Sequence, residues 1–225
     1  MAYNFDKIAR TYDRLNRLMT LGLDRRWRGR AAHAVESGKR EEESVLDVAC
    51  GTGDMAVGLA ERGCTVTGVD LSEKMLAIAK RKVESGKWKV ADAENLPFPD
   101  DSFDAVTCAF GVRNFVHLEK GLSEMLRVLK PGGRMVILEL ATPDSKLILP
   151  FYNLYTKHII PWLGSRIAGN REAYTYLPDS IARFPKGAAF LDIIQNLKFK
   201  VQNCTERKFT FGVCRLYTIN KEAAD

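Results

Sequence analysis

The sequence lacks any run of about 18 consecutive apolar residues, which argues against a membrane-spanning helix. Its N-terminus has none of the features of a secretory signal peptide. The five cysteines form no C-x-x-C pair, and their odd number argues against a disulfide framework. Because most of them lie in apolar runs, we expect reduced thiols in the core of a cytoplasmic protein.

Signs of metal or nucleic-acid binding are also missing. The three histidines are scattered without metal-ligand spacing, so we expect no metal site. The net charge of +6 is spread too evenly to predict a nucleic-acid surface. The sequence contains neither internal repeats nor low-complexity segments. With 225 residues, 46% of them apolar, it predicts one α/β domain that carries a long insertion or extension.

The most informative pattern lies at residues 46–54, LDVACGTGD. An apolar run ends in a turn of small residues and a segment with helical spacing follows, which predicts strand, glycine turn and helix. In open α/β sheets the ligand binds at the carboxyl ends of the strands, where this turn would lie. Gly51, Gly53 and Ala56 also fit the dinucleotide pattern G-x-G-x-x-A, so the glycines alone do not identify the ligand.

Acidic residues around the turn help to separate the alternatives. Asp47 precedes the turn, and Asp54 begins the helix after it. A pyrophosphate favours a helix N-terminus without negative charge, whereas two carboxylates suit a ligand with a positive end. The amino group of S-adenosylmethionine (SAM) is such an end. The alternative for Asp54 is that it only caps its helix.

Two further strands are predicted to end in acids. Asp70 ends a strand over residues 64–70, and an acid at this distance from the glycine turn can accept hydrogen bonds from ribose hydroxyls. Asp92 ends a strand over residues 87–92 and, with Ala93, would meet an adenine amino group. Ser72 is the expected N-cap of the helix between these strands. Additional strands are expected over residues 105–110 and 134–140, and Glu139 lies near the end of the second.

The flanking segments are predicted to be largely helical. Residues 4–37 have apolar side chains at three- and four-residue steps, and residues 14–30 hold six arginines against one acid. This basic stretch is either a solvated helix face or a contact with anionic lipid or an anionic substrate group. Residues 143–186 have an aromatic face that predicts a lid over an apolar substrate, a membrane-contacting flap, or an extra packed helix.

Alternating strands and helices of this kind predict an α/β fold with a doubly wound, mainly parallel sheet. A helix over residues 187–197 and two closing strands complete it. We expect one domain with four parts: a helical cap, a ligand-binding core, the helical insertion, and the closing helix and strands, over residues 1–43, 44–142, 143–186 and 187–225.

Longer motifs run through nearly the whole chain. They are FDKIARTYDRLN (5–16), GLDRRWR (22–28), LDVACGTGD (46–54), LPFPDDSFD (96–104), FGVRN (110–114), RVLKPGG (127–133) and YTYLPDSIARFP (174–185). In these motifs the chain resembles the UbiE/MenG/Coq5 family of SAM-dependent quinol C-methyltransferases, and FGVRN and YTYLPDSI are particular to that family. The resemblance implies a Rossmann-like class I methyltransferase fold, with seven strands, N-terminal helices and a helical insertion before the last two strands.

The resemblance also implies where SAM binds. The expected cofactor-binding residues are Asp47, Gly51, Thr52, Gly53, Asp70, Leu71, Asp92, Ala93 and Ala109. This chain departs from the family at two places. Ala109 stands where a serine or similar small residue is common, so any hydroxyl contact is lost. Tyr217 and Ile219 replace a C-terminal histidine and glycine.

The implied reaction is methylation of a ring carbon of a demethylated quinol, in the first place demethylmenaquinol to menaquinol. The quinol becomes a strong carbon nucleophile only as its O–H loses a proton. Arg113 is the best candidate to stabilise the phenolate or to orient a water that takes the proton, and Asn114 is expected to fix the second oxygen. Tyr12 and Asp13 are expected to line the pocket, with Asp13 as the alternative proton acceptor.

Three other functions stay open at this point. They are a methyltransferase for another aromatic or polyprenyl substrate, including the ubiquinone-pathway benzoquinol; a nicotinamide-dependent oxidoreductase; and a SAM-binding protein without catalysis. The expected partners are a prenylated quinol and an anionic membrane surface, which would place the protein at the inner face of the membrane. No nucleic acid is expected, and the sequence does not decide whether the protein is a homodimer.

Overall fold

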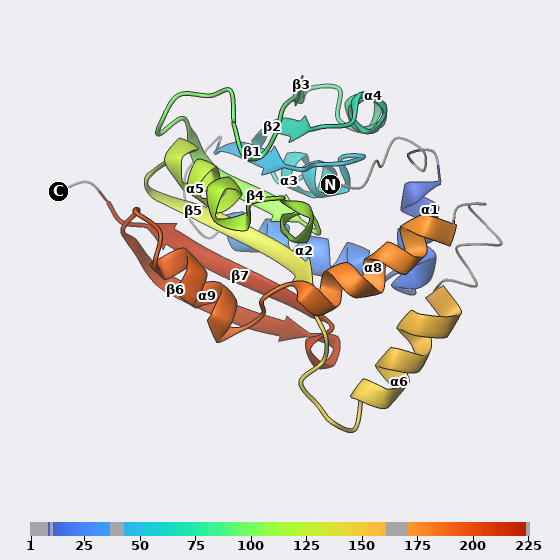
Figure 1. The fold of residues 1–225 in the computed structure, drawn as a ribbon. Helices are drawn as coiled ribbons and strands as arrows, with labels where there is room; N and C mark the ends of the chain where they lie inside the picture. Colours follow the sequence, from blue (N-terminus) through green and yellow to red (C-terminus); the bar gives the residue numbers. More distant parts are fainter. Residues whose placement is uncertain (1–8, 10, 37–42, 161–170, 224–225) are drawn as a thin grey trace.

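A computed structural model describes residues 9, 11–36, 43–160 and 171–223. In this part of the chain, seven strands form one sheet in the order β3-β2-β1-β4-β5-β7-β6 (Figure 1). The strands are β1 (Ser44–Val48), β2 (Thr65–Asp70), β3 (Lys87–Val90), β4 (Phe103–Ala109), β5 (Leu129–Leu140), β6 (Val201–Phe209) and β7 (Cys214–Lys221). Strands β1 to β5 run parallel, and β7 is antiparallel to both of its neighbours. The predicted doubly wound, mainly parallel sheet is therefore confirmed.

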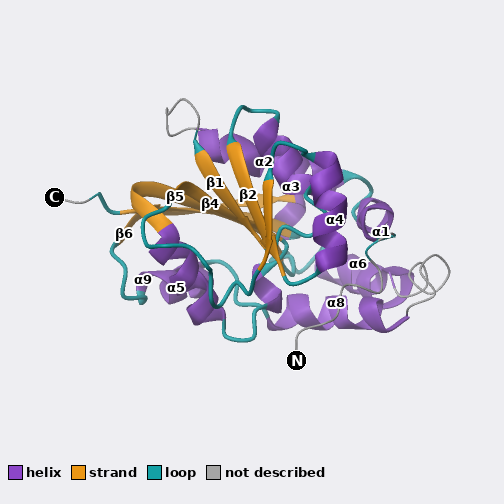
Figure 2. Ribbon diagram, turned by 90° about the horizontal axis from the view of Figure 1, so that it is seen from above, coloured by secondary structure: helices purple, strands orange, loops and turns teal. Residues whose placement is uncertain are grey.

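Helices cover both faces of this sheet (Figure 2). One face is covered by α2 (Leu23–Glu36), α3 (Asp54–Ala60) and α4 (Glu73–Lys82), and the other by α5 (Leu118–Val128) and α9 (Ala188–Gln195). Each face has its own apolar cluster, as expected where crossover helices must bury one stripe against strands that are apolar on both sides. As predicted, Ser72 caps α4, since its hydroxyl accepts a hydrogen bond from the backbone N–H of Met75 at 3.1 Å.

The predicted N-terminal helical segment is present, and it is divided into two helices. Residues 4–8 lie outside the described residues, and the rest forms α1 (Tyr12–Met19) and α2, with a turn between them. Leu21 and Gly22 take positive φ angles of 52° and 77° in that turn, which no α-helix allows. The apolar periodicity continues through Leu21, so the pattern gave no sign of the break. The fifth strand also begins earlier than predicted, at Leu129 instead of Arg134.

The insertion contains α6 (Leu149–Leu154), the π-helical turn η3 (Tyr155–Ile159) and α8 (Arg171–Arg183). In Figure 1, α6 lies at the periphery of the molecule, and α8 passes between it and the sheet. The predicted single apolar face is wrong, because the side chains divide between two sides of the helix. Phe151 and Leu154 point outward and are 73% and 57% exposed, whereas Tyr155 packs against Leu15 of α1.

The five cysteines are all free thiols, and Cys50, Cys108 and Cys214 are buried in the core, as the sequence predicts. Burial raises the pKa of these three thiols well above the ordinary value. Among the described helices, none has the length and apolar character needed to cross a membrane.

Candidate cofactor and substrate sites

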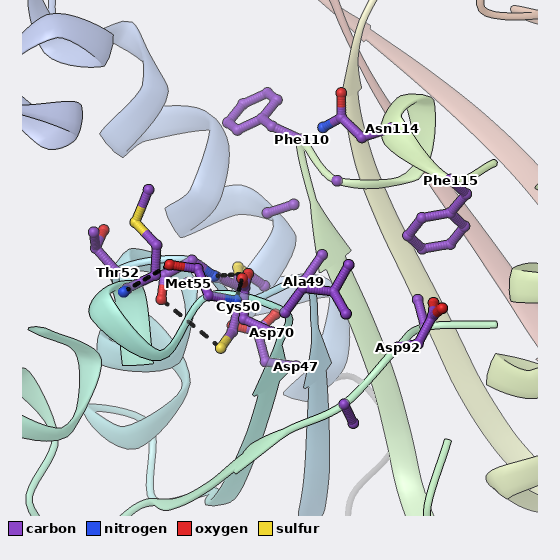
Figure 3. Close-up of a pocket in the computed structure, with 18 of the residues that line it drawn as sticks. Asp47, Ala49, Cys50, Thr52, Met55, Asp70, Asp92, Phe110, Asn114 and Phe115 are labelled. Atoms are coloured by element: carbon purple, nitrogen blue, oxygen red, sulfur yellow. Dashed lines mark hydrogen bonds between the residues drawn. The ribbon is translucent and has the colours of Figure 1, made fainter. Parts of the chain in front are cut away.

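A cavity of about 610 Å³ lies along the carboxyl ends of β3, β2, β1 and β4. The sheet order reverses between β1 and β4, which is where ligands bind in open parallel sheets. Figure 3 shows Asp47 and Asp70 beside the glycine loop, with Asp92 and Phe115 toward one end of the cavity. The topology thus brings together side chains from four separate strand ends, as the strand-end acids in the sequence predict.

The glycine loop between β1 and α3 uses its two glycines differently. Gly51 has a φ of 54° and would place a Cβ in open space, so its backbone borders the cavity. Gly53 has a φ of 80°, and a Cβ there would lie 2.9 Å from the Cβ of Ala79 on α4. Gly53 therefore allows α3 and α4 to pack closely and does not line the cavity, whereas Thr52 does.

Asp70 holds the loop in this shape. Its Oδ2 accepts a hydrogen bond from the backbone N–H of Gly51 at 2.9 Å, and its Oδ1 accepts one from the backbone N–H of Ser72 at 2.9 Å. Each carboxylate oxygen has a second lone pair, so the side chain still has acceptor capacity toward the cavity that it lines. Leu71, next in the chain, is largely exposed at the cavity rim.

Asp47 is the most unusual polar side chain of the cavity. It is fully buried, and its Oδ1 accepts a hydrogen bond from the hydroxyl of Thr107, its partner on β4, at 2.9 Å. Its Oδ2 has no hydrogen-bond partner among the described residues. Burial raises the pKa of Asp47 to about 7, although the Thr107 hydrogen bond and the charge of Arg28 act in the opposite direction. A buried acceptor of this kind favours a ligand with a positive group.

The far end of the cavity follows β3. Asp92, Ala93 and Glu94 all line it, and the backbone N–H of Glu94 donates to Oδ1 of Asp92 at 2.9 Å. Glu94 also accepts two hydrogen bonds from His117, from the backbone N–H and from Nδ1 of the ring, both at 2.8 Å. This Glu94–His117 contact joins the β3 end to the start of α5, and sequence reasoning did not identify it.

Helix α1 is attached to the glycine loop by a polar network. The hydroxyl of Thr52 donates to Asp13 at 2.5 Å, and Nζ of Lys82 on α4 donates to Asp13 at 2.6 Å and to Asp54 at 2.5 Å. Burial alone would raise the pKa of Asp54, but this Lys82 hydrogen bond and the charges of Arg28 and Lys82 lower it. Asp54 is thus already paired with protein cations, and Asp13 lines neither cavity.

A second cavity of about 190 Å³ adjoins the first. Tyr12, Arg28 and Phe110 line both cavities, so these side chains stand at their junction. The second cavity lies between α1, α2 and the insertion, and most of its lining is apolar, with Met19, Leu23, Trp27, Leu140, Ile160, Leu177, Ile181 and Val213. A mostly apolar pocket with a few polar groups is typical of a site for an apolar ligand with a polar head.

Arg113 and Asn114 both lie on the short helix η2 (Val112–Asn114), which follows β4, but their side chains line different cavities. Asn114 lines the first cavity and Arg113 the second. Nη1 of Arg113 donates to Glu139 Oε1 at 2.6 Å and to the Phe110 carbonyl at 2.5 Å, and both charged side chains are almost fully buried. Arg113 and Glu139 therefore form a buried ion pair. The turn is tight, because a Cβ at Gly111 would lie 2.6 Å from Sγ of Cys108.

Two residues that line or support these cavities, Arg28 and Glu139, do not stand out in the sequence. The sequence shows Glu139 only as an acid near a strand end, because its pairing with Arg113 depends on the β4–β5 register. In the sequence, Arg28 is one of six arginines in a basic run. Asp24 lies four residues before it, a spacing that places two side chains together on a helix. In the structure, Nη1 of Arg28 and Oδ2 of Asp24 form an ion pair at 2.5 Å. Arg28 also lies over the Phe110 ring, 4.9 Å from its centroid.

The two sequence departures have structural consequences. Ala109 lines the first cavity without a hydroxyl, as expected. Tyr217 and Ile219 are buried on β7, and the Tyr217 hydroxyl accepts a hydrogen bond from the backbone N–H of Gly187 at 2.9 Å. These two positions therefore stabilise the closing strands and lie outside both cavities.

Comparison with known proteins agrees with this architecture. The ubiE/COQ5 methyltransferase family matches residues 2–221. A ubiquinone/menaquinone biosynthesis C-methyltransferase UbiE from Geobacter sulfurreducens is 43% identical, over 96% of this chain and 86% of that protein. A demethylmenaquinone methyltransferase from Thermus thermophilus is 45% identical, over 95% of this chain and 97% of that protein.

Solved structures show the same fold at low identity. A SAM-dependent methyltransferase from Methanosarcina mazei is 20% identical with a TM-score of 0.58, over 85% of this chain and 97% of that one. The [4+2]-cyclase SpnF is 19% identical with a TM-score of 0.63, over 87% of this chain and 82% of that one. Because the second is described as a cyclase, the fold alone does not specify the reaction.

Proposed function

The chain belongs to the ubiE/COQ5 methyltransferase family, and we propose that it transfers the methyl group of SAM to a ring carbon of demethylmenaquinol in menaquinone biosynthesis. Family membership makes the chain a SAM-dependent methyltransferase and disfavours the nicotinamide-dependent alternative. The observation that carries the proposal is a cavity lined by several acids, one of them fully buried, beside a mostly apolar cavity, in a chain of this family. One cavity suits SAM and the other a quinol.

The residues of the first cavity fit SAM. The free Oδ2 of Asp47 provides a buried acceptor for the amino group. We assign the ribose hydroxyls to Asp70 and the adenine to Asp92 and Ala93, because these side chains follow β2 and β3 along the cavity. Bound SAM supplies an electrophilic methyl group on a sulfonium. Asn114 lines the cavity near its junction with the second one, where the acceptor must meet that methyl group.

The residues at the junction suit phenolate chemistry. Ring methylation replaces a carbon-bound hydrogen, so the balanced reaction releases one proton. Arg113 remains protonated, and Glu139 and the Phe110 carbonyl fix its guanidinium beside the second cavity. We assign Arg113 to stabilise the phenolate, Asn114 and Tyr12 to position the ring, and a water to accept the quinol proton. Asp13 lines neither cavity and accepts hydrogen bonds from Lys82 and Thr52, so we assign it to hold α1 over the glycine loop.

The outer side of the insertion suits a membrane surface. Leu147, Phe151 and Leu154 are 82%, 73% and 57% exposed, which is unusual for large apolar residues that gather on one short segment. Exposed cations lie on the same part of the insertion, at Lys146 and Lys157. We propose that this face contacts an anionic membrane, which is where a prenylated quinol resides.

The N-terminal basic run contributes less to this surface than its sequence suggests. Arg28 forms an ion pair with Asp24 inside the protein, and Arg17 forms one with Asp54, in which Nη2 lies 3.7 Å from Oδ2. The four arginines of the run that are exposed, and could therefore contact lipid, are Arg14, Arg25, Arg26 and Arg30.

Vesicle sedimentation tests the membrane contact. Phe151→Ser combined with Leu154→Ser should reduce binding to vesicles that contain anionic lipid, whereas Val90→Ser should not, because Val90 is exposed on the opposite edge strand β3. Equal binding by both variants would contradict the assignment of this face.

Methyl transfer from labelled SAM to a short-tailed demethylmenaquinol, under reducing conditions with vesicles, tests the reaction. We expect product methylated on the ring carbon. If SAM binds and no product forms, the acceptor is another aromatic compound, such as the ubiquinone-pathway benzoquinol. If SAM does not bind, the whole assignment is wrong.

A further inference from the structure

Helix α6 is built with its apolar side outward. Phe151 and Leu154 face solvent, while Tyr152 of α6 and Tyr155, the first residue of η3, line the second cavity. A surface helix usually turns its apolar side to the core and its polar side to water. The reversed arrangement brings two tyrosine hydroxyls to a mostly apolar cavity, so their hydrogen bonds need to be accounted for.

The hydroxyls around Tyr152 are already used within the protein. The Tyr155 hydroxyl donates to the Met19 carbonyl at 3.0 Å, and the Thr156 hydroxyl donates to the backbone carbonyl of Tyr152 at 2.9 Å. On the opposite wall, the Thr20 hydroxyl bonds to Asp24 at 2.9 Å. The Tyr152 hydroxyl, in contrast, has no hydrogen-bond partner within the described ranges. A tyrosine that is kept in such a cavity without a protein partner is suited to a ligand oxygen.

Tyr152 and Arg113 line the same small cavity. Burial raises the pKa of Tyr152 to about 12, and the nearby charge of Arg113 only partly offsets this. The hydroxyl therefore stays protonated at neutral pH. It can donate a hydrogen bond to an oxyanion and is unsuited to act as a base.

We propose that Tyr152 is a catalytic residue of the proposed methylation, whose hydroxyl donates a hydrogen bond to the quinol oxygen as that oxygen becomes negative. This inference rests on the proposed function. Tyr152 keeps its own proton throughout. The quinol O–H proton goes to water, and the ring carbon loses its hydrogen as a proton after the C–C bond has formed. The quinol oxygen regains one proton from water, so one proton is released in all. Arg113 and Tyr152 then act on the phenolate from two elements, η2 and α6.

Tyr152→Phe removes only the hydroxyl. We expect kcat to fall about a hundredfold, the size typical of one lost oxyanion donor, with little change in SAM affinity. A purely structural role would instead lower the melting temperature and affect KM and kcat together. If kcat stays within twofold of the wild type while the wild type methylates demethylmenaquinol, the inference is wrong. An inactive wild type that still binds SAM would instead overturn the proposed substrate.

A binding measurement tests the same hydrogen bond without turnover. The probe is 4-methoxy-1-naphthol, a quinol analogue whose absorbance separates the phenol from the phenolate. We expect the ionisation midpoint of the probe bound to the wild type to be lower than that of the free probe. The midpoint of the probe bound to Tyr152→Phe should be about one pH unit higher than that of the probe bound to the wild type. Tyr155→Phe is the matched control and should keep the wild-type midpoint, since its hydroxyl is engaged by Met19. Equal midpoints in all three proteins, or no binding to the wild type, would overturn the inference.

Discussion

The proposed contact between the buried carboxyl of Asp47 and the amino group of SAM predicts that SAM affinity depends on pH. An ammonium group binds well only to the ionised carboxylate, and the pKa of Asp47 is raised from 3.8 to about 7. The ionised fraction is then about nine tenths at pH 8 and about one tenth at pH 6. We therefore expect SAM to bind about tenfold more weakly at pH 6 than at pH 8.

The same raised pKa has a consequence for stability, with the opposite dependence. A group whose folded-state pKa exceeds its unfolded value stabilises the fold when protonated, and that contribution is lost as pH rises from about 4 through about 7. The shift corresponds to about 4 kcal/mol in total, of which about 3 kcal/mol falls between pH 5 and pH 9. Asp47→Asn cannot ionise, so its free energy of unfolding relative to the wild type should rise by that amount over this range.

Calorimetry and chemical denaturation at several pH values measure both effects. The control ligand is 5′-methylthioadenosine, which lacks the amino-acid end and should bind with little dependence on pH or on Asp47→Asn. Thr107→Val removes the hydrogen bond that lowers the pKa of Asp47, so the midpoint of SAM binding should move to higher pH. A SAM affinity that is constant between pH 6 and pH 8 in the folded protein would refute the assigned role of Asp47.

Four further variants test separate parts of the site. Arg113→Ala should reduce turnover about a hundredfold with SAM affinity nearly intact, and full activity would remove Arg113 from the mechanism. Asp70→Ala should weaken SAM binding in calorimetry, and unchanged affinity would defeat that assignment. Gly53→Ala combines a φ of 80° with a 2.9 Å contact to Ala79, so it should cost about 2 kcal/mol of unfolding free energy; an unchanged melting curve would contradict this. Asp13→Asn should speed hydrogen exchange in α1 and SAM dissociation, and wild-type rates would show that the Lys82 contact does not hold the helix.

The sheet and the polar half of the site could be predicted because their signals are local. Strands β1 and β2 are short runs of mostly apolar residues, and an acid near the ends of β1, β2 and β3 marks the sheet edge without knowledge of the partner strand. Asp47, Asp70 and Asp92 follow from that rule, and all three line one cavity. The break at Leu21 could not be predicted, because an apolar residue that continues a helical period also occurs in a turn with positive φ.

Contacts between distant segments set the limit of sequence reasoning. Asp13 lies 69 residues from Lys82, and Arg113 lies 26 residues from Glu139. Composition around either residue does not reveal its partner, because pairing depends on where the crossover helices pack and on the β4–β5 register. The roles of Asp13 and Arg113 therefore needed the fold: one closes a helix over the glycine loop, and the other is fixed by a buried acid.

The orientation of α6 shows the same limit most directly. Periodicity locates an apolar stripe on a helix but does not say which side faces the protein. On the side that faces the protein, the Tyr155 hydroxyl donates to the Met19 carbonyl. On the outer side, Phe151 does not pack into the core and is 73% exposed. A lid over the substrate and a membrane-contacting flap were separate predictions, yet one short helix presents a face suited to each. Under the proposed function a prenylated quinol would use both, since its ring would reach Arg113 while its tail starts from the bilayer.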